Sequence, residues 1–100
     1  MQAGKKSSAV QLSETEIERI SQALAAPRRY QLLRDIGAAD DQCACTTLLE
    51  MHDISAATLS HHLKELERAG LIYYHRDGKF KSMSLRRDVV QAYAERLAKI

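Results

Sequence analysis

The sequence predicts a mainly α-helical domain with one small β-hairpin, in the order of four helices, two strands and a last helix. Apolar residues recur at the helical period of about 3.6 in segments between residues 13 and 70, and again over residues 86–100. Between these segments, residues 71–76 and 79–85 are β-prone and flank Asp77-Gly78, a strong signal for a two-residue hairpin turn. The length of 100 residues suits a single domain with one modest core.

The first helix is predicted from a capping pattern. Ser13 and Glu16 have the spacing of a capping box, and Ile17, Ile20 and Leu24 then follow at helical spacing. The preceding residues 1–12 are mostly small and polar. We therefore expect a flexible N-terminal arm over residues 1–12, followed by one domain over residues 13–100.

The second helix is predicted to begin at Pro27, because proline suits the first turn of a helix, and to end at Gly37. Residues 38–42 then form a loop. A second capping pattern, Thr47 with Glu50, is predicted to open a short third helix. The apolar residues of the second helix are Tyr30, Leu32, Leu33 and Ile36.

The fourth helix, residues 55–70, is the best-defined element. Ser55 can cap its start, and Gly70 can end it in the left-handed conformation. Its apolar stripe, which should face the core, consists of Leu59, Leu63 and Leu66. The short turn at residues 52–54 joins it to the third helix with the spacing of a helix-turn-helix.

The opposite face of the fourth helix predicts DNA binding. Small residues allow close approach to a major groove, hydroxyls and imidazole can hydrogen-bond to base edges, and cations bind phosphate. An ordinary solvated face is the alternative interpretation. The residues of this face are Ala57, Thr58, Ser60, His61, Lys64 and Arg68. The neighbouring His62 is predicted to lie half-buried at the core edge and to donate to a backbone group.

The predicted hairpin carries cations near its tip. Arg76, Lys79 and Lys81 are expected to contact phosphate rather than bases. A hairpin directly after a helix-turn-helix is a wing, so the predicted fold is a winged helix-turn-helix, α-α-α-α-β-β-α. Residues 58–87 contain seven Lys and Arg against three Asp and Glu, whereas residues 1–57 contain six against eight. The cationic part of the chain thus coincides with the predicted DNA-binding part.

Other classes of function are less well supported. No apolar run reaches membrane-spanning length and the chain does not start with a signal-peptide pattern, so we expect a cytoplasmic protein with no membrane partner. Without a phosphate-binding glycine loop or a nucleophile–base pair, an enzyme is not expected. A winged-helix protein-interaction module without DNA binding is the alternative, and it would expose apolar anchors on the fourth helix.

Three stretches of the sequence resemble the ArsR–SmtB family of metal- and metalloid-responsive repressors. They are Ala23-Leu24-Ala25-Ala26-Pro27-Arg28-Arg29, Cys43-Ala44-Cys45, and Leu59-Ser60-His61-His62-Leu63-Lys64-Glu65-Leu66-Glu67-Arg68-Ala69-Gly70-Leu71-Ile72. The resemblance covers residues 14–98 and implies a homodimeric repressor that binds a palindromic operator in double-stranded DNA. It also implies release by an inducer, and base contacts through Ala57, Thr58, Ser60 and His61.

The first and last helices are the predicted dimer interface. The apolar face of the last helix is too broad for one small core, so we expect it to pack on the first helix and on a second subunit. The resemblance implies the same interface. The residues assigned to it are Ile17, Ile20, Leu24, Val90, Tyr93 and Leu97.

Cys43 and Cys45 leave three interpretations open. Two thiolates one residue apart can bind a thiophilic metal or metalloid ion. Thiols near a helix start can also form a redox switch, which would make the protein a redox- or non-metal-responsive regulator of the same fold. Both can instead be small packing residues. The resemblance implies a third cysteine in arsenic-sensing relatives, three residues after the second, where this chain has Leu48.

Overall fold

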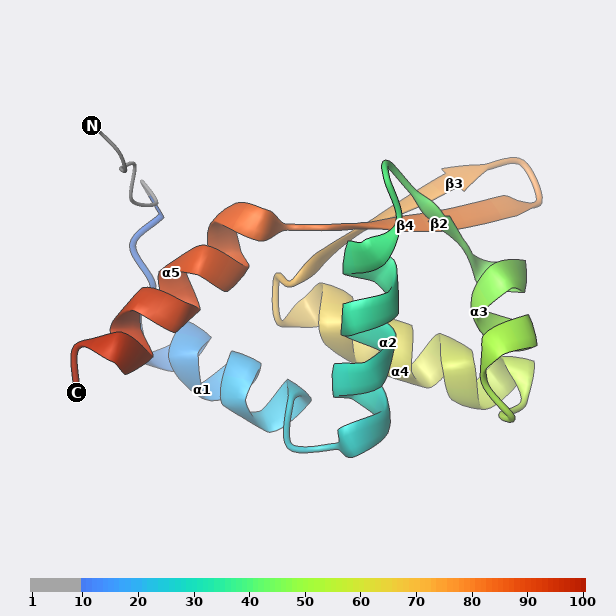
Figure 1. Ribbon diagram of the computed structural model, residues 1–100. Coiled ribbons are helices and arrows are strands. Elements are labelled where there is room, and N and C mark those ends of the chain that lie inside the picture. Colours follow the sequence, from blue (N-terminus) through green and yellow to red (C-terminus); the bar gives the residue numbers. More distant parts are fainter. Residues whose placement is uncertain (1–9) are drawn as a thin grey trace.

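The computed structural model describes residues 10–100, which form five helices and a three-stranded antiparallel sheet (Figure 1). The helices are α1 (Glu14–Ala23), α2 (Pro27–Ala38), α3 (Cys45–Met51), α4 (Ala56–Arg68) and α5 (Arg87–Ala98). The strands are β2 (Cys43–Ala44), β3 (Ile72–Asp77) and β4 (Phe80–Leu85), with β4 in the centre. The predicted winged helix-turn-helix is confirmed. Over residues 10–100, no helix combines the length and the apolar character needed to cross a membrane.

The local signals at the start of α1 and at both ends of α4 act as predicted. Ser13 Oγ accepts a hydrogen bond from the Glu16 backbone N–H at 3.1 Å, and Glu16 Oε1 accepts one from the Ser13 N–H at 2.7 Å. These bonds lower the pKa of the Glu16 carboxyl. Ser55 Oγ accepts from the Thr58 N–H at the start of α4, and Gly70, with a φ of 79°, follows its end. Such caps satisfy groups that a helix end leaves unpaired.

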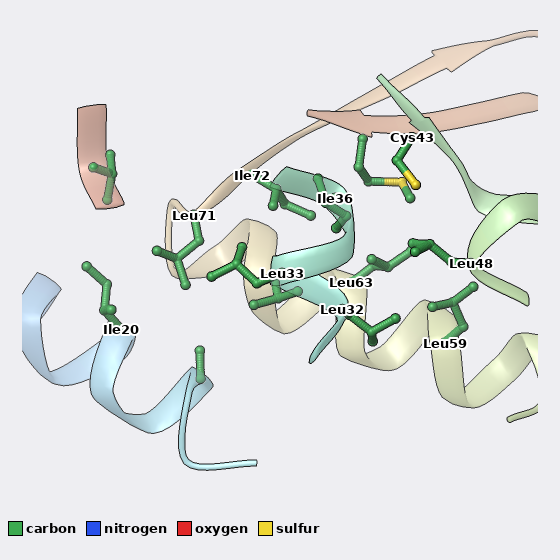
Figure 2. Packing of buried hydrophobic residues seen from close by; sticks show 14 residues of the cluster. Ile20, Leu32, Leu33, Ile36, Cys43, Leu48, Leu59, Leu63, Leu71 and Ile72 are labelled. Carbon is green, nitrogen blue, oxygen red and sulfur yellow. The ribbon is translucent and has the colours of Figure 1, made fainter. Parts of the chain in front are cut away.

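The core lies between α2, α4 and the sheet. Figure 2 shows the apolar side chains of α2 and α4 converging, with α3 and β2 contributing at one end and α1 at the other. The predicted leucine stripe of α4 is at most 1% exposed. The main members of the core are Ile20, Leu32, Ile36, Leu48, Leu59, Leu63, Leu66, Leu71 and Met83. Burying this stripe holds α4 in place and leaves its opposite face to solvent.

The structure corrects the prediction for the start of α3. Cys43 and Ala44 form a strand that pairs with β4, so the sheet has three strands instead of two. Helix α3 then begins at Cys45, and no side chain caps it. The predicted capping role of Thr47 and Glu50 is therefore wrong. Pairing with a strand about 40 residues later in the chain fixes this segment, and a local pattern contains no signal for such a contact.

The predicted end of α2 at Gly37 is wrong, because the helix continues to Ala38. A Cβ atom at Gly37 would lie 3.0 Å from Leu85 Cδ2. The close approach of β4 to α2 therefore accounts for the glycine, which permits this contact.

The hairpin turn is displaced by one residue from its predicted position. Asp77 pairs with Phe80, so the two turn residues are Gly78 and Lys79 rather than Asp77 and Gly78. Gly78 has a φ of 63°, and no non-glycine residue of the described chain has a positive φ. A positive φ at the first turn position alone is typical of a type II′ turn with glycine there.

Helices α1 and α5 lie side by side at the end of the molecule away from the wing tip (Figure 1). The hydroxyls of Ser21 and Tyr93 are 2.8 Å apart. Arg96 donates to a Glu14 carboxylate oxygen at 2.7 Å and to the Leu12 carbonyl at 2.9 Å. Leu12 also packs against the core, so the end of the predicted arm belongs to the fold. Residues 1–9 of that arm lie outside the described residues.

Candidate nucleic-acid interface

The first turns of α4 present the predicted base-reading residues to solvent. Ala57, Thr58, Ser60 and His61 are all exposed, because the leucine stripe holds the other face in the core. Ser55, which caps the helix, also donates its hydroxyl to Thr58 Oγ1 at 3.0 Å and so orients that side chain. The Ser60 and His61 side chains form no hydrogen bond with any residue of 10–100. Both can therefore bond to a ligand.

His61 and His62 differ in environment, although their ring centroids are only 5.9 Å apart. His61 is exposed and His62 is half-buried, as predicted. The predicted bond from His62 to a backbone group is wrong. Its Nδ1 lies 3.5 Å from Nη1 of Arg29, and it accepts this weak bond because a guanidinium can only donate. Burial, followed by the nearby Arg29 charge, lowers the pKa of His62.

Two predicted phosphate-binding cations lie further along α4. Lys64 and Arg68 are both exposed. Arg68 Nη1 is 3.3 Å from Glu65 Oε2, a surface ion pair of little energetic value. No ion pair of Lys64 forms within residues 10–100. Lys64 is therefore the less neutralised cation of the two.

The wing tip brings together the three cations predicted for it. Arg76 and Lys81 are paired across β3 and β4, Lys79 lies in the turn, and all three are exposed. The Arg76 guanidinium carbon lies 4.7 Å from the centroid of the Tyr74 ring, a cation–π contact that orients it. Asp77 is the single carboxylate among residues 76–81, so the tip keeps a net positive charge.

A cleft of about 210 Å³ lies between α3, the first turns of α4 and the wing. Ser60 of α4 borders it together with Lys79 and Lys81 of the wing. A base-reading candidate and two phosphate-binding candidates thus share one surface. Thr46 and Phe80 also line this cleft, although the sequence did not point to them. Phe80 is 59% exposed. An aromatic residue on a β-prone segment suggests core packing, whereas Phe80 lies directly after the turn, paired with Asp77 at the wing tip.

The two cysteines occupy different environments. Cys43 is buried in β2 beside the core (Figure 2), whereas Cys45 is half-buried at the start of α3 with its Sγ 3.9 Å from Tyr74 Oη. Burial, with the charges of Asp35 and Cys45, raises the pKa of Cys43 and so opposes its thiolate form. No three His, Cys, Asp or Glu side chains within residues 10–100 are grouped to hold a metal ion. The thiols suit a soft ion chemically, but the fold does not preform a closed site.

The residues predicted for the dimer interface fall into two groups. Ile20 is fully buried in the core of its own protomer and has no surface to offer a partner, which corrects its predicted place in the interface. The others keep some exposure, the largest being 52% at Leu97. The half-buried members are Ile17, Leu24, Val90 and Tyr93.

Known proteins share parts of this sequence. Residues 24–74 match a family model described as a helix-turn-helix domain. An uncharacterized HTH-type transcriptional regulator of Bacillus subtilis, YceK, is 32% identical over 74 residues, which are 74% of this chain and 74% of that protein. The cadmium resistance transcriptional regulatory protein CadC of Listeria innocua is 34% identical over 56 residues, which are 56% of this chain and 46% of CadC.

Solved structures share the fold. An ArsR-like transcriptional regulator from Rhodococcus sp. RHA1 has a TM-score of 0.74 at 20% identity, covering 85% of this chain and 78% of that chain. The homodimeric winged helix-turn-helix DNA-binding domain of Mb0332 from Mycobacterium bovis has a TM-score of 0.70 at 22% identity, covering 89% and 87%. The fold, with its exposed helix and wing, is that of a winged helix-turn-helix domain. The sequence matches show that the chain belongs to the ArsR family of transcriptional regulators.

Proposed function

We propose that this protein is a sequence-specific DNA-binding repressor that acts as a homodimer on a palindromic operator and leaves it in response to an inducer. The observation that carries the proposal is the cleft that Ser60 of α4 shares with Lys79 and Lys81 of the wing. A polar helix face beside cations suits a major-groove contact flanked by phosphate contacts. The exposed face of α4 also lacks the apolar anchors that a protein-interaction module would need.

Within this proposal, the residues divide by what they contact. The small and polar residues of the first turns of α4 approach base edges and supply sequence preference. The cations bind phosphate and supply affinity that depends on salt. The base-reading residues are Ala57, Thr58, Ser60 and His61, and the phosphate-binding residues are Lys64, Arg68, Arg76, Lys79 and Lys81.

The proposed homodimer pairs α1 and α5 with the same helices of a second copy. Leu24, Tyr93 and Leu97 keep apolar surface exposed there, and the similar Mb0332 domain is named as homodimeric. Two-fold symmetry would place two reading helices about 34–36 Å apart, one turn of DNA. This spacing is the reason for expecting a palindromic operator.

For the inducer, we propose a thiophilic metal or metalloid ion that engages Cys43 and Cys45. Thiolate ligands suit such ions, and the relative CadC is named for cadmium resistance. Cys43 must first leave its buried place in β2, and α3 follows directly at Cys45. The alternative class of inducer is an oxidant that acts on the half-buried Cys45 and on Cys43.

The test begins with selection of a duplex from a random pool by the wild-type protein, followed by titration against that duplex and a scrambled version at one salt concentration. We expect two inverted half-sites about 10–10.5 base pairs apart, centre to centre. Affinity for the selected duplex should exceed that for the scrambled duplex by about a thousandfold or more. Equal affinity for both would exclude sequence-specific binding and leave the interaction module as the function.

A further inference from the structure

A buried polar cluster ties the turn between α3 and α4 to α2. His52 directly follows α3, and its side chain is only 7% exposed. Its Nε2 lies 2.7 Å from Asp35 Oδ2, and its Nδ1 lies 3.0 Å from Arg28 Nη1. Arg28 and Asp35 both belong to α2 and are seven residues apart, so they share one face of that helix. We call these three residues the turn anchor.

The chemistry of the partners assigns one tautomer to His52. A guanidinium can only donate, so Nδ1 accepts from Arg28. Nε2 must then carry the hydrogen and donate to the Asp35 carboxylate, whose side chain is 14% exposed. Both ring nitrogens thus have a hydrogen-bond partner, one as acceptor and the other as donor. A satisfied buried network of this kind permits one orientation of the ring, unlike an apolar side chain of similar size.

The anchor fixes the end of α3, whereas other contacts fix its start and middle. Strand β2 pairs with β4 directly before α3, and Leu48, with the partly buried Cys45 and Leu49, packs on the core. The His52 backbone N–H bonds to the Leu48 carbonyl at 3.0 Å and closes the end of α3. Ser55, the cap of α4, follows only three residues later. The position of His52 therefore sets both the end of α3 and the start of α4.

We infer that the turn anchor positions the reading helix, and that Arg28, His52 and Asp35 are determinants of operator specificity through this orientation. The inference rests on the proposed DNA-binding function. None of the three residues lies on the exposed face of α4, so they act as positioning residues. Base contacts need their side chains held to within about 0.5 Å and 10–20°, which is the precision that a directional network provides.

The test uses a double variant, His52→Leu with Asp35→Leu, in the full chain. Replacing His52 and Asp35 by apolar side chains of similar volume removes the directional bonds without leaving either of them as an unpaired buried group, and the half-buried Arg28 that loses its acceptor can reach solvent. The probes are the duplex selected by the wild-type protein and its scrambled version. Ile36→Val is the matched control, because Ile36 is a buried residue of α2 outside the anchor. Melting curves accompany all titrations.

We expect the double variant to melt near the wild-type temperature, to bind the selected duplex about 5- to 150-fold more weakly, and to bind the scrambled duplex as before. Ile36→Val should bind both duplexes like the wild type. Long-range ¹H–¹⁵N spectra of the wild-type protein should show the Nε2–H tautomer of His52. Wild-type affinity for the selected duplex in the double variant, or the Nδ1–H tautomer, would overturn the inference.

A second variant covers the case in which the double variant does not fold. Arg28→Met removes only the half-buried donor to Nδ1 and should weaken selective binding while the protein stays folded. Unchanged affinity in a folded Arg28→Met protein would overturn the inference. Failure of the proposed function gives a different result, because the wild-type protein would then bind the selected and the scrambled duplex equally well.

Discussion

Alanine at Ser60 or at His61 should separate DNA recognition from folding. Both side chains are exposed on α4 and form no hydrogen bond within the described chain, so neither substitution removes a buried contact. Alanine also has a higher helix propensity than serine or histidine, by about 0.5 kcal/mol. A domain of this size gains about 4–8 °C in melting temperature per kcal/mol. We therefore expect the melting temperature to stay the same or to rise by about 2–4 °C.

Operator affinity should fall in both variants. A lost base contact costs about 1–3 kcal/mol, which raises Kd about 5- to 150-fold. Binding to random DNA depends on phosphate contacts, which these substitutions leave in place. The assay is fluorescence anisotropy with the selected and scrambled duplexes at one salt concentration, together with a melting curve for each protein. Gln31→Ala, exposed on α2, is the control and should bind like the wild type.

Two results would refute this reasoning. Unchanged operator affinity in both variants would show that the first turns of α4 do not read bases. Loss of folding in His61→Ala would show that the imidazole supports the core, in conflict with its exposure in the structure.

Four further predictions concern the other surfaces. Lys79→Ala should weaken binding to operator and random DNA alike and lower the salt slope of log K by about one, because one phosphate contact is lost; a changed sequence preference with an unchanged slope would contradict this role. Leu97→Glu puts a charge on the proposed dimer face, and sedimentation should then give monomers of 11.3 kDa where the wild type gives twice that mass; a monomeric wild type that binds a palindrome tightly would exclude the interface. The double variant Cys43→Ser, Cys45→Ser should bind operator but no longer leave it with Cd(II) or arsenite, whereas release equal to that of the wild type would assign both residues to packing. His62 has a pKa lowered from 6.5, so the unfolded chain binds more protons than the folded one and stability should fall as pH drops through that value; His62→Gln should flatten the melting temperature between about pH 7.5 and 5.5, and an unchanged pH dependence would contradict the assignment.

Much of the fold follows from signals that are local in the sequence. The capping box at Ser13 and Glu16, the cap at Ser55 and the glycine at Gly70 all act as predicted. Each involves residues within four positions of one another, so the pattern and the interaction coincide. The leucine stripe of α4 also follows from helical geometry alone. Since it fixes the phase of the helix, it predicts which residues of the candidate interface are exposed.

The features that the sequence did not reveal depend on contacts between distant segments. Strand β2 exists because Cys43 and Ala44 pair with β4, and Gly37 lies inside α2 at a point where a Cβ atom would crowd Leu85 of β4. Phe80 is exposed at the wing tip, where it pairs with Asp77 in a hairpin whose turn lies one residue later than predicted. The partners of His52 lie 17 and 24 positions away. The sequence around His52 does not predict its burial, because the burial depends on the face of α2 that carries Arg28 and Asp35.

Helix α2 connects the two ends of the molecule through a pair of adjacent arginines. Arg28 reaches the turn before α4 by its bond to His52. Arg29 donates through Nε to the Ala23 carbonyl at the end of α1 at 2.7 Å, and its Nη1 lies 3.5 Å from His62 on α4. Arg29 thus bonds to the end of α1 and weakly to α4, while Arg28 bonds to the turn that follows α3. Since α1 belongs to the proposed dimer face and α4 to the proposed DNA face, we expect movements of the two faces to be linked through α2.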